Sequence, residues 1–427
     1  MSHFPNDALA DAGLSARFDA LRAKALLAGA AGLAAGVVGA IVAPEAFFPG
    51  YLAAFLFWTS VSLASLGFCL LFQLAGGSWM VPLRRPFEAA GWQILLMAVF
   101  FLPVYFGLNW TYAWTQGEIV KGNELIHHKV DVIKYLTPSG FATRAAIYFA
   151  IWAAVAYMVN AWSRQQDGEA TDAPTRRLIA AAGPATLVMF LTTSFAAFDW
   201  GMSRDPEWYS TIYGAMFAVG SLLTGLALAT AFAARHLDGE PIRTALTVGR
   251  LNDAGNLLLA FTMLWAYFSF SQFLIIWLGN LPEEVIWYQR RIGGIWGVVA
   301  LGLIFFGFFA PFLALLQRKH KRDVAWVLPI ATWIVVMRAV DVAWLVIPGH
   351  PLTAGSTGVE AAFPWGAVAF YATSLVGIGG VWTALFLRRL ASAPLVPPRD
   401  PTVVAAQEYG LAHGDGPAHE PTGGATR

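Results

Sequence analysis

The chain has 427 residues and a formal net charge of +1, and it is 57% hydrophobic but only 12% charged. Soluble domains carry about 25% charged residues, so this composition excludes an ordinary soluble protein and indicates that most of the surface faces lipid. The single cysteine, Cys69, excludes an intrachain disulfide, and it also excludes an iron–sulfur cluster or a covalent c-type haem held by this chain alone.

Ten apolar segments are long enough to cross a bilayer, for which about 20 residues are needed. The first segment is the shortest. Its leader is long and nine spans follow, so we interpret it as a retained helix rather than a cleaved signal peptide. The predicted fold class is an all-α integral membrane protein with ten transmembrane helices. The predicted spans are 25–43, 51–74, 90–108, 145–162, 177–198, 210–234, 255–280, 292–316, 324–347 and 363–387.

Spans 2–5 and 6–9 are predicted to be parallel repeats, each forming a four-helix bundle. In both copies the last span has a proline near its start, Pro184 or Pro329, and an Asp and a Trp toward its far end. Spans 1 and 10 contain closely spaced glycines and are predicted to be peripheral helices. The predicted division is 1–24 as an N-terminal segment, 25–43, 51–198 as bundle one, 210–347 as bundle two, 363–387, and 391–427 as a tail.

Most of the 27 Lys and Arg residues lie in the termini and in the loops on the same side of the membrane. By the positive-inside rule this predicts that both termini are cytoplasmic and that the loop after span 5 is at the outer face. The tail 391–427 is rich in Pro, Gly, Ala and His and has no apolar periodicity. We expect it to be flexible, or to run as an extended strap along a partner.

Two spans contain ionisable residues that are costly in hydrocarbon, about 3 kcal/mol each on insertion scales. Arg338 and Asp341 are three residues apart, on one helical face, and would be either a structural ion pair or a proton relay. Asp199 lies at the outer end of span 5, where it would be either a span-ending residue held by an arginine or backbone partner, or part of a proton path. Pro206, in the loop that follows, is suited to starting the next helix.

Span 7 carries a polar stripe along its length. Asp253 lies at its cytoplasmic mouth, and Tyr267 and Ser271 are four residues apart on one face within the membrane. The stripe would either line a water-filled proton path or make hydrogen bonds between helices. Asp253 has a further alternative, as the N-cap of the span.

None of the eight histidines lies deep inside a predicted span. A haem held in a helical bundle needs such axial ligands, so we expect no haem or metal to be bound by this chain. The loop 109–144 is long and rich in charged residues, and we expect it to be a docking surface at the outer face.

Two long segments carry a family resemblance. "FAAFDWGMSRDPEWYSTIYGAMFAVGSLLTG" (195–225) and "DAGNLLLAFTMLWAYFSFSQFLIIWLGNLPEEVIWY" (253–288) resemble the NrfD/polysulfide-reductase-like membrane subunits of bacterial alternative complex III, a quinol:electron-acceptor oxidoreductase. The resemblance extends over all ten spans. The segment "SQFLIIWLGNLPEE" and the short N-terminus are more similar to ActF than to its sister subunit ActC.

The resemblance implies a cofactor-free subunit of the bacterial inner membrane, without nucleic-acid partners. Its expected neighbours are an ActC-like subunit that oxidises quinol, a multihaem cytochrome c, an iron–sulfur subunit, small membrane subunits and lipid. By position, the resemblance assigns a proton path to Asp199, Asp253, Arg338 and Asp341. The alternative is a secondary transporter with a polar intramembrane site. Such transporters break their helices near midplane, whereas the prolines here lie near span ends.

Overall fold

The computed structural model describes residues 12–236, 245–352, 358, 362–401 and 403–405, and within these ranges it contains helices and no strands. Ten helical segments are long and apolar enough to cross a membrane, which confirms the predicted all-α membrane fold. The spans are α1 (Ala12–Val42), α2 (Pro44–Ala75), α3 with α4 (Arg84–Trp92, Ile94–Phe106), α8 (Pro138–Gly168), α9 (Ala173–Trp200), α10 (Ile212–His236), α12 (Val248–Gly279), α14 with η5 and α15 (Gly294–Gly302, Leu303–Phe309, Ala310–Leu316), α17 (Val324–Val346) and α18 (Trp365–Leu390).

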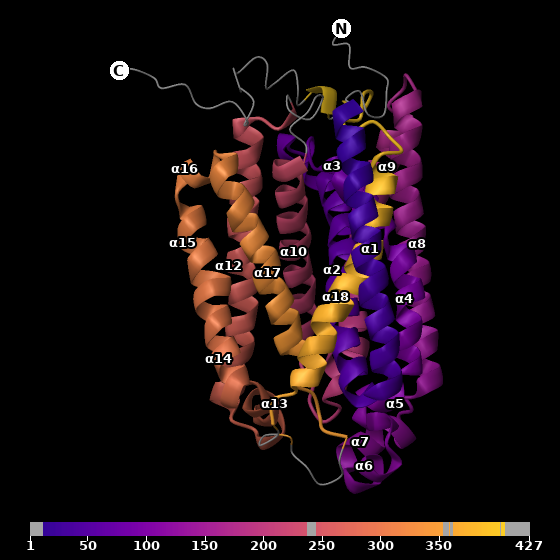
Figure 1. Cartoon of the computed structure of the whole chain (residues 1–427), viewed down its shortest axis with the longest axis vertical. Helices are drawn as coiled ribbons and strands as arrows, with labels where there is room; N and C mark the ends of the chain where they lie inside the picture. Colours follow the sequence, from indigo (N-terminus) through magenta and orange to yellow (C-terminus); the bar gives the residue numbers. More distant parts are fainter. Residues whose placement is uncertain (1–11, 237–244, 353–357, 359–361, 402, 406–427) are drawn as a thin grey trace.

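Short helices connect the spans. We call the loop 201–211 between α9 and α10 the hook, and the end of the molecule at which it lies the hook end. The opposite end, where α1 begins and α18 ends, is the terminal end (Figure 1). The short helices are η1 (Ser78–Met80), α5 (Leu108–Thr111), η2 (Ala113–Thr115), α6 (Gly117–Gly122), α7 (Glu124–His127), η3 (His128–Val132), η4 (Met202–Arg204), α13 (Pro282–Ile292) and α16 (Arg318–Lys321).

Local sequence signals explain where several spans begin. Proline occupies the first turn of α2, α8 and α9, where its missing N–H costs no hydrogen bond. Thr137 caps α8 by accepting a hydrogen bond from the Gly140 amide, and Thr247 caps α12 through the Arg250 amide. The first span is longer than predicted, because the strong helix formers that precede residue 25 continue α1 back to Ala12.

Eight of the spans form two groups of four, and one helix of each group, α2 in the first and α10 in the second, lies at the centre where the groups meet. α2 packs on α3, α4, α8 and α9, while α10 packs on α12 and α17, and α12 and α17 both contact α15. α2 and α10 pack against each other. In the most apolar 18-residue stretch of each helix, 83% of the residues of α2 and 78% of those of α10 are buried. The corresponding value is 22% for α12 and for the span built from α14. The two groups therefore meet at α2 and α10 and leave their outer helices facing lipid or other subunits (Figure 1).

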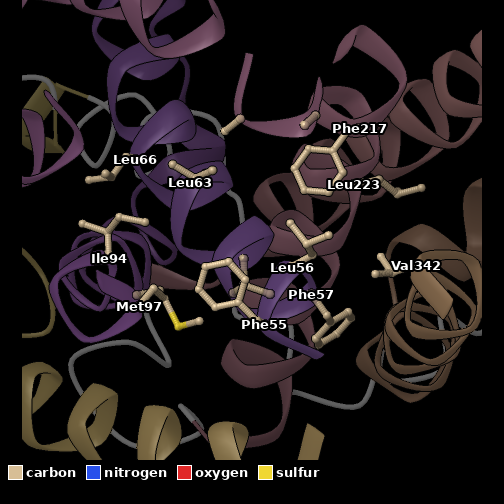
Figure 2. Packing of buried hydrophobic residues seen from close by; sticks show 14 of the residues in the cluster. Phe55, Leu56, Phe57, Leu63, Leu66, Ile94, Met97, Phe217, Leu223 and Val342 are labelled. Carbon is tan, nitrogen blue, oxygen red and sulfur yellow. The ribbon is translucent and has the colours of Figure 1, made fainter. Parts of the chain in front are cut away.

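Figure 2 shows the apolar packing at this junction. Phe55, Leu56 and Phe57 of α2 lie among side chains from α4, α10 and α17, including Met97 and Val342. Lipid tails are as apolar as these side chains, so the gain comes from close van der Waals contact rather than from leaving water.

α1 and α18 pack closely on each other and on α2, in front of both groups in Figure 1. The helices touch at glycines: a Cβ on Gly32 would lie 2.5 Å from the Gly377 nitrogen, and a Cβ on Gly380 would lie 2.4 Å from the Ala25 oxygen. Any side chain at these positions would push the helices apart.

The beginning of the tail differs from the expectation of a flexible segment from residue 391 onward. Leu395, Val396 and Asp400 are buried against the terminal end of the chain, and Asp400 has no exposed surface. The segment consists of turns and bends and so has no helical period, yet its apolar side chains and one carboxylate pack against the helix bundle. Residues 406–427 lie outside the described part of the chain.

Candidate functional site: buried charge pairs within and beside the membrane

Arg338 and Asp341 form an ion pair in the half of α17 nearer the hook end. Arg338 Nη1 donates to Asp341 Oδ2 at 2.6 Å, and both side chains are about 95% buried. Arg338 Nε also donates to Thr224 Oγ1 of α10 at 3.3 Å, and the guanidinium lies 5.2 Å from the ring centroid of Trp265 on α12. The pair thus faces the interior of the second group and is held by three of its helices.

Gly220 on α10 makes room for this arginine. A Cβ at residue 220 would lie 2.0 Å from Arg338 Nη2, which is closer than any real contact. The guanidinium therefore lies directly against the backbone of α10, and any side chain at residue 220 would require it to move.

Asp199 is paired in the first group. Its side chain has no exposed surface, and its Oδ2 accepts hydrogen bonds from Arg144 Nε and from the Tyr148 hydroxyl, both at 2.8 Å. Asp199 Oδ1 and Arg144 Nη2 are buried without a hydrogen-bond partner in the protein. The bond from Arg144 to Asp199 corresponds to one of the predicted alternatives, in which an arginine or a backbone group holds this carboxylate. The two atoms leave one acceptor and one donor available to a bridging water molecule.

Arg144 separates Asp199 from the hook-end surface. Its guanidinium stacks 4.0 Å from the ring centroid of Tyr135, in the loop before α8, and Nη1 donates to the Tyr135 carbonyl at 2.9 Å. The Arg144 side chain is 20% exposed, in contrast to the 4% of Arg338. Burial, followed by the nearby Asp199 carboxylate, raises the pKa of Tyr135 to about 12, so this phenol stays neutral.

The hook contains a third and larger charge cluster. Asp205 accepts from Arg290 Nη1 at 2.5 Å and from Arg291 Nη2 at 3.0 Å, and all three side chains are at least 98% buried. Arg204 donates to the carbonyls of Thr111, Val346 and Ile347. The hook thereby joins α5, α13 and the end of α17. Pro206 lies in a turn and α10 begins only at Ile212, so the expectation that Pro206 starts the helix is wrong.

The outer part of the hook is polar and more accessible. Glu207 Oε1 accepts from Asn123 Nδ2 at 2.5 Å and lies 3.5 Å from His350 Nε2. The hydrogen bond with His350 holds the pKa of Glu207 below its usual value, although burial acts in the opposite direction. A cavity of about 840 Å³ opens beside this region, and Trp110, Arg204 and His350 are among its lining residues.

The polar residues of span 7 do not join the Arg338–Asp341 pair. Tyr267 is 63% exposed on the outer face of α12, and Ser271 is half-buried. Asp253 is half-buried in the second turn of α12, whose N-cap is Thr247, so the N-cap alternative for Asp253 is wrong. The buried polar residue near the hook end of this helix is Gln272, which accepts from Ser210 at 2.5 Å.

A fourth cluster lies at the terminal end of the first group and was missed from the sequence. Arg84, Arg85 and Glu88 of α3 are buried together with Asp400 of the tail, and Arg85 also pairs with Asp167 of α8, whose side chain is 15% exposed. The predicted span 3 began at residue 90, which made the two arginines look like exposed loop charges. The spacing of Arg84 and Glu88, four residues apart, is the sequence signal that indicates a helical ion pair.

No group of three or more His, Cys, Asp or Glu side chains within the described ranges is arranged to hold a metal ion. The buried clusters described above pair carboxylates with arginines. Neither a protein-family model nor a curated protein matches this sequence.

Proposed function

We propose that this chain is a membrane subunit of a bacterial quinol:electron-acceptor oxidoreductase of the alternative complex III type, similar to ActF. In this proposal it provides a proton path beside an ActC-like, quinol-oxidising subunit and has no redox centre of its own. It would lie in the inner membrane with the terminal end in the cytoplasm. The observation that carries the proposal is the presence of one buried carboxylate–arginine pair near the hook end of each four-helix group.

The chemistry of each pair suits proton transfer. A carboxylate can accept and release a proton, whereas arginine stays charged and can only hold the carboxylate in place. Each carboxylate is buried and lies within hydrogen-bond distance of a guanidinium, at 2.8 Å for Asp199 with Arg144 and at 2.6 Å for Asp341 with Arg338, so a change in the charge of either acid alters its bond with the arginine. When Asp341 takes up a proton, Arg338 loses its counterion and keeps only Thr224 and the face of Trp265. Protonation is thereby coupled to the packing of α10, α12 and α17.

Partner binding is part of the same proposal. The outer faces of α12 and of the α14 span are apolar and exposed, as expected of helices that contact lipid or a second membrane subunit. The hook end would face the haem-bearing and iron–sulfur subunits, and the cavity beside His350 is where the chain would border a quinol.

The alternative of a secondary transporter is less well supported. Transporter sites are usually formed by helices that unwind near the middle of the membrane. α9, α12 and α17 are continuous in the structure. Two other described spans are irregular, and both keep backbone hydrogen bonds. α3 changes to α4 at Gln93, whose amide donates to the Ala90 carbonyl and whose carbonyl accepts from the Met97 amide. Span 8 contains the π-helical segment Leu303–Phe309.

The test compares proton release with electron transfer in proteoliposomes of the whole complex. Asp341→Asn keeps the shape of the side chain and removes its titration, so we expect normal assembly and impaired proton-coupled turnover. Arg338→Ala should assemble poorly, because it leaves a buried carboxylate without its cation. Asp172→Asn, at an exposed ion pair with Arg176, is the matched control. If Asp341→Asn retains both the wild-type rate and the wild-type proton yield, the pair is structural and the proton path is refuted.

A further inference from the structure

The terminal end of the first helix group is closed by a part of the chain that lies far away in sequence. We call residues 391–401 the C-terminal strap. Its Asp400 pairs with Arg84, which is 316 residues away, and the Asp400 side chain is completely buried. Arg84 Nε also donates to Glu88 Oε1 at 3.0 Å. Asp400 is thus one of two carboxylates that neutralise this arginine.

The pair belongs to a connected network. Glu88 accepts from Arg85 Nη1 at 2.5 Å and from Ser163 Oγ at 2.6 Å, and Arg85 also pairs with Asp167. The arginines within reach of this network outnumber its carboxylates. The arginines are Arg84, Arg85, Arg164 and Arg389, and the carboxylates are Glu88, Asp167 and Asp400. Without the strap, the buried Arg84 would keep Glu88 as its carboxylate partner and lose Asp400.

Backbone and apolar contacts also hold the strap. Arg85 Nε donates to the Pro394 carbonyl at 3.1 Å, and Gln166 Nε2 donates to the Arg399 carbonyl at 3.1 Å. Leu395 and Val396 are at least 97% buried. The hydrogen bonds to the Pro394 and Arg399 carbonyls come from side chains of α3 and α8, and neither replaces a hydrogen bond inside a helix. The strap can therefore leave without breaking the helical structure of any span.

The single cysteine, Cys69 on α2, is 4% exposed. α2 packs directly on α3, and the Arg84 guanidinium lies 5.7 Å from the ring centroid of Phe72, which follows Cys69 by three residues on α2. The thiol therefore lies about one helical turn from a side chain that contacts the buried cluster, and water admitted to the cluster would come close to it.

We propose that the C-terminal strap is a plug that the chain binds in cis. Arg84 and Arg85 form a carboxylate-binding site, Asp400 is its ligand, and withdrawal of the strap admits water to Glu88 and Cys69 at the terminal end of the first group. The proposal is independent of the quinol oxidoreductase function, because it concerns access to one end of the bundle and not what the bundle transports.

Cys69 is a native reporter for this opening. The whole complex in nanodiscs would be treated with a charged maleimide, which does not enter the bilayer, and modification of Cys69 would be followed by mass spectrometry. We expect slow labelling of the wild-type chain. Asp400→Asn removes one partner of a buried ion pair and should raise the labelling rate by roughly 100-fold. Deletion of residues 391–427 should have at least as large an effect, whereas deletion of residues 406–427 should leave the rate unchanged.

Further variants keep the test decisive if the longer deletion does not assemble. Asp400→Glu keeps the charge and should restore protection, and Val396→Ala should raise the rate to an intermediate value. Asp341→Asn should be labelled as slowly as wild type, so a failure of the proton path would not affect this result. If assembled Asp400→Asn and Val396→Ala chains are labelled at the wild-type rate, the strap does not close the bundle. The proposal is also overturned if only a neutral, lipid-soluble maleimide reacts.

Discussion

Replacing Asp205 with asparagine should destabilise the protein much more than the same substitution at an exposed ion pair. Asp205 accepts hydrogen bonds from two arginines, Arg290 at 2.5 Å and Arg291 at 3.0 Å, and each of the three side chains is at least 98% buried. Asparagine keeps one oxygen acceptor but turns an NH₂ group toward a guanidinium. It takes the full negative charge away from Arg291 and leaves Arg290 with Glu207, whose Oε2 lies 3.8 Å from Arg290 Nη2.

The magnitude follows from two estimates. A hydrogen bond to a charged group contributes about 1.5–3 kcal/mol. Breaking a buried ion pair by removing one partner costs about 3–5 kcal/mol. We therefore expect Asp205→Asn to lower the free energy of unfolding by about 3–5 kcal/mol, because only one of the two bonds can be retained.

Unfolding in mixed micelles, titrated with denaturing detergent and followed by tryptophan fluorescence, measures this difference. The control is Asp172→Asn, because Asp172 binds Arg176 at 2.8 Å with side chains that are 48% and 71% exposed. Exposed pairs contribute about 0–1 kcal/mol, so this variant should be close to wild type. Equal losses of stability in the two variants would refute the assignment of the hook as a buried electrostatic junction.

Gly220→Ala should impair assembly or turnover in the same way as Arg338→Ala, because the new Cβ would lie 2.0 Å from Arg338 Nη2. A thermal unfolding transition at the wild-type temperature in this variant would contradict the packing described. Glu207 has a lowered pKa in the folded protein, so its stabilising contribution is present above the pKa of the unfolded chain and is lost as pH falls through the folded value. The protection of hook amides against hydrogen exchange, after correction for the intrinsic pH dependence of exchange, should therefore fall on acidification, and Glu207→Gln should weaken that dependence. Lys121 is 77% exposed in the loop 109–144 and should cross-link to a neighbouring subunit in the intact complex, whereas free labelling without cross-links would argue against docking. The chain separated from its partners should show no Soret absorption, and a stoichiometric haem that stays bound would contradict the expectation that it holds none.

The sequence predicted the spans well because membrane thickness imposes one strong requirement, a long apolar run, on each of them. The Arg338–Asp341 pair was also accessible from sequence, since its members are three residues apart on one helix. The other pairs join residues that are distant along the chain. Arg144 and Asp199 are 55 residues apart, Asp205 and Arg291 are 86 apart, and only the packing of the helices brings them together.

The tail shows a different reason for failure. Its composition is typical of a disordered segment, because it has few apolar residues and no helical period. Burial of Asp400 needs neither property. Burial of Asp400 depends on a buried arginine to pair with, and that arginine is Arg84. In the sequence, Arg84 was itself interpreted as a loop charge. An error at one end of span 3 thus concealed the binding site of the tail.

The two carboxylates near the hook end differ in their access to water, and this difference gives a direction to the proposed path. Asp199 is separated from the surface by Arg144, which is 20% exposed and stacks on Tyr135 in a loop. Arg338 and Asp341 are enclosed by α10, α12 and α17, with only 4–5% of their side chains exposed. In the proposed path, a proton on Asp199 would reach the hook end by movement of one side chain, whereas a proton on Asp341 would require rearrangement between helices. Because the hook fixes the end of α17 through Arg204, such a rearrangement must occur within the second helix group and not by separation of the two groups.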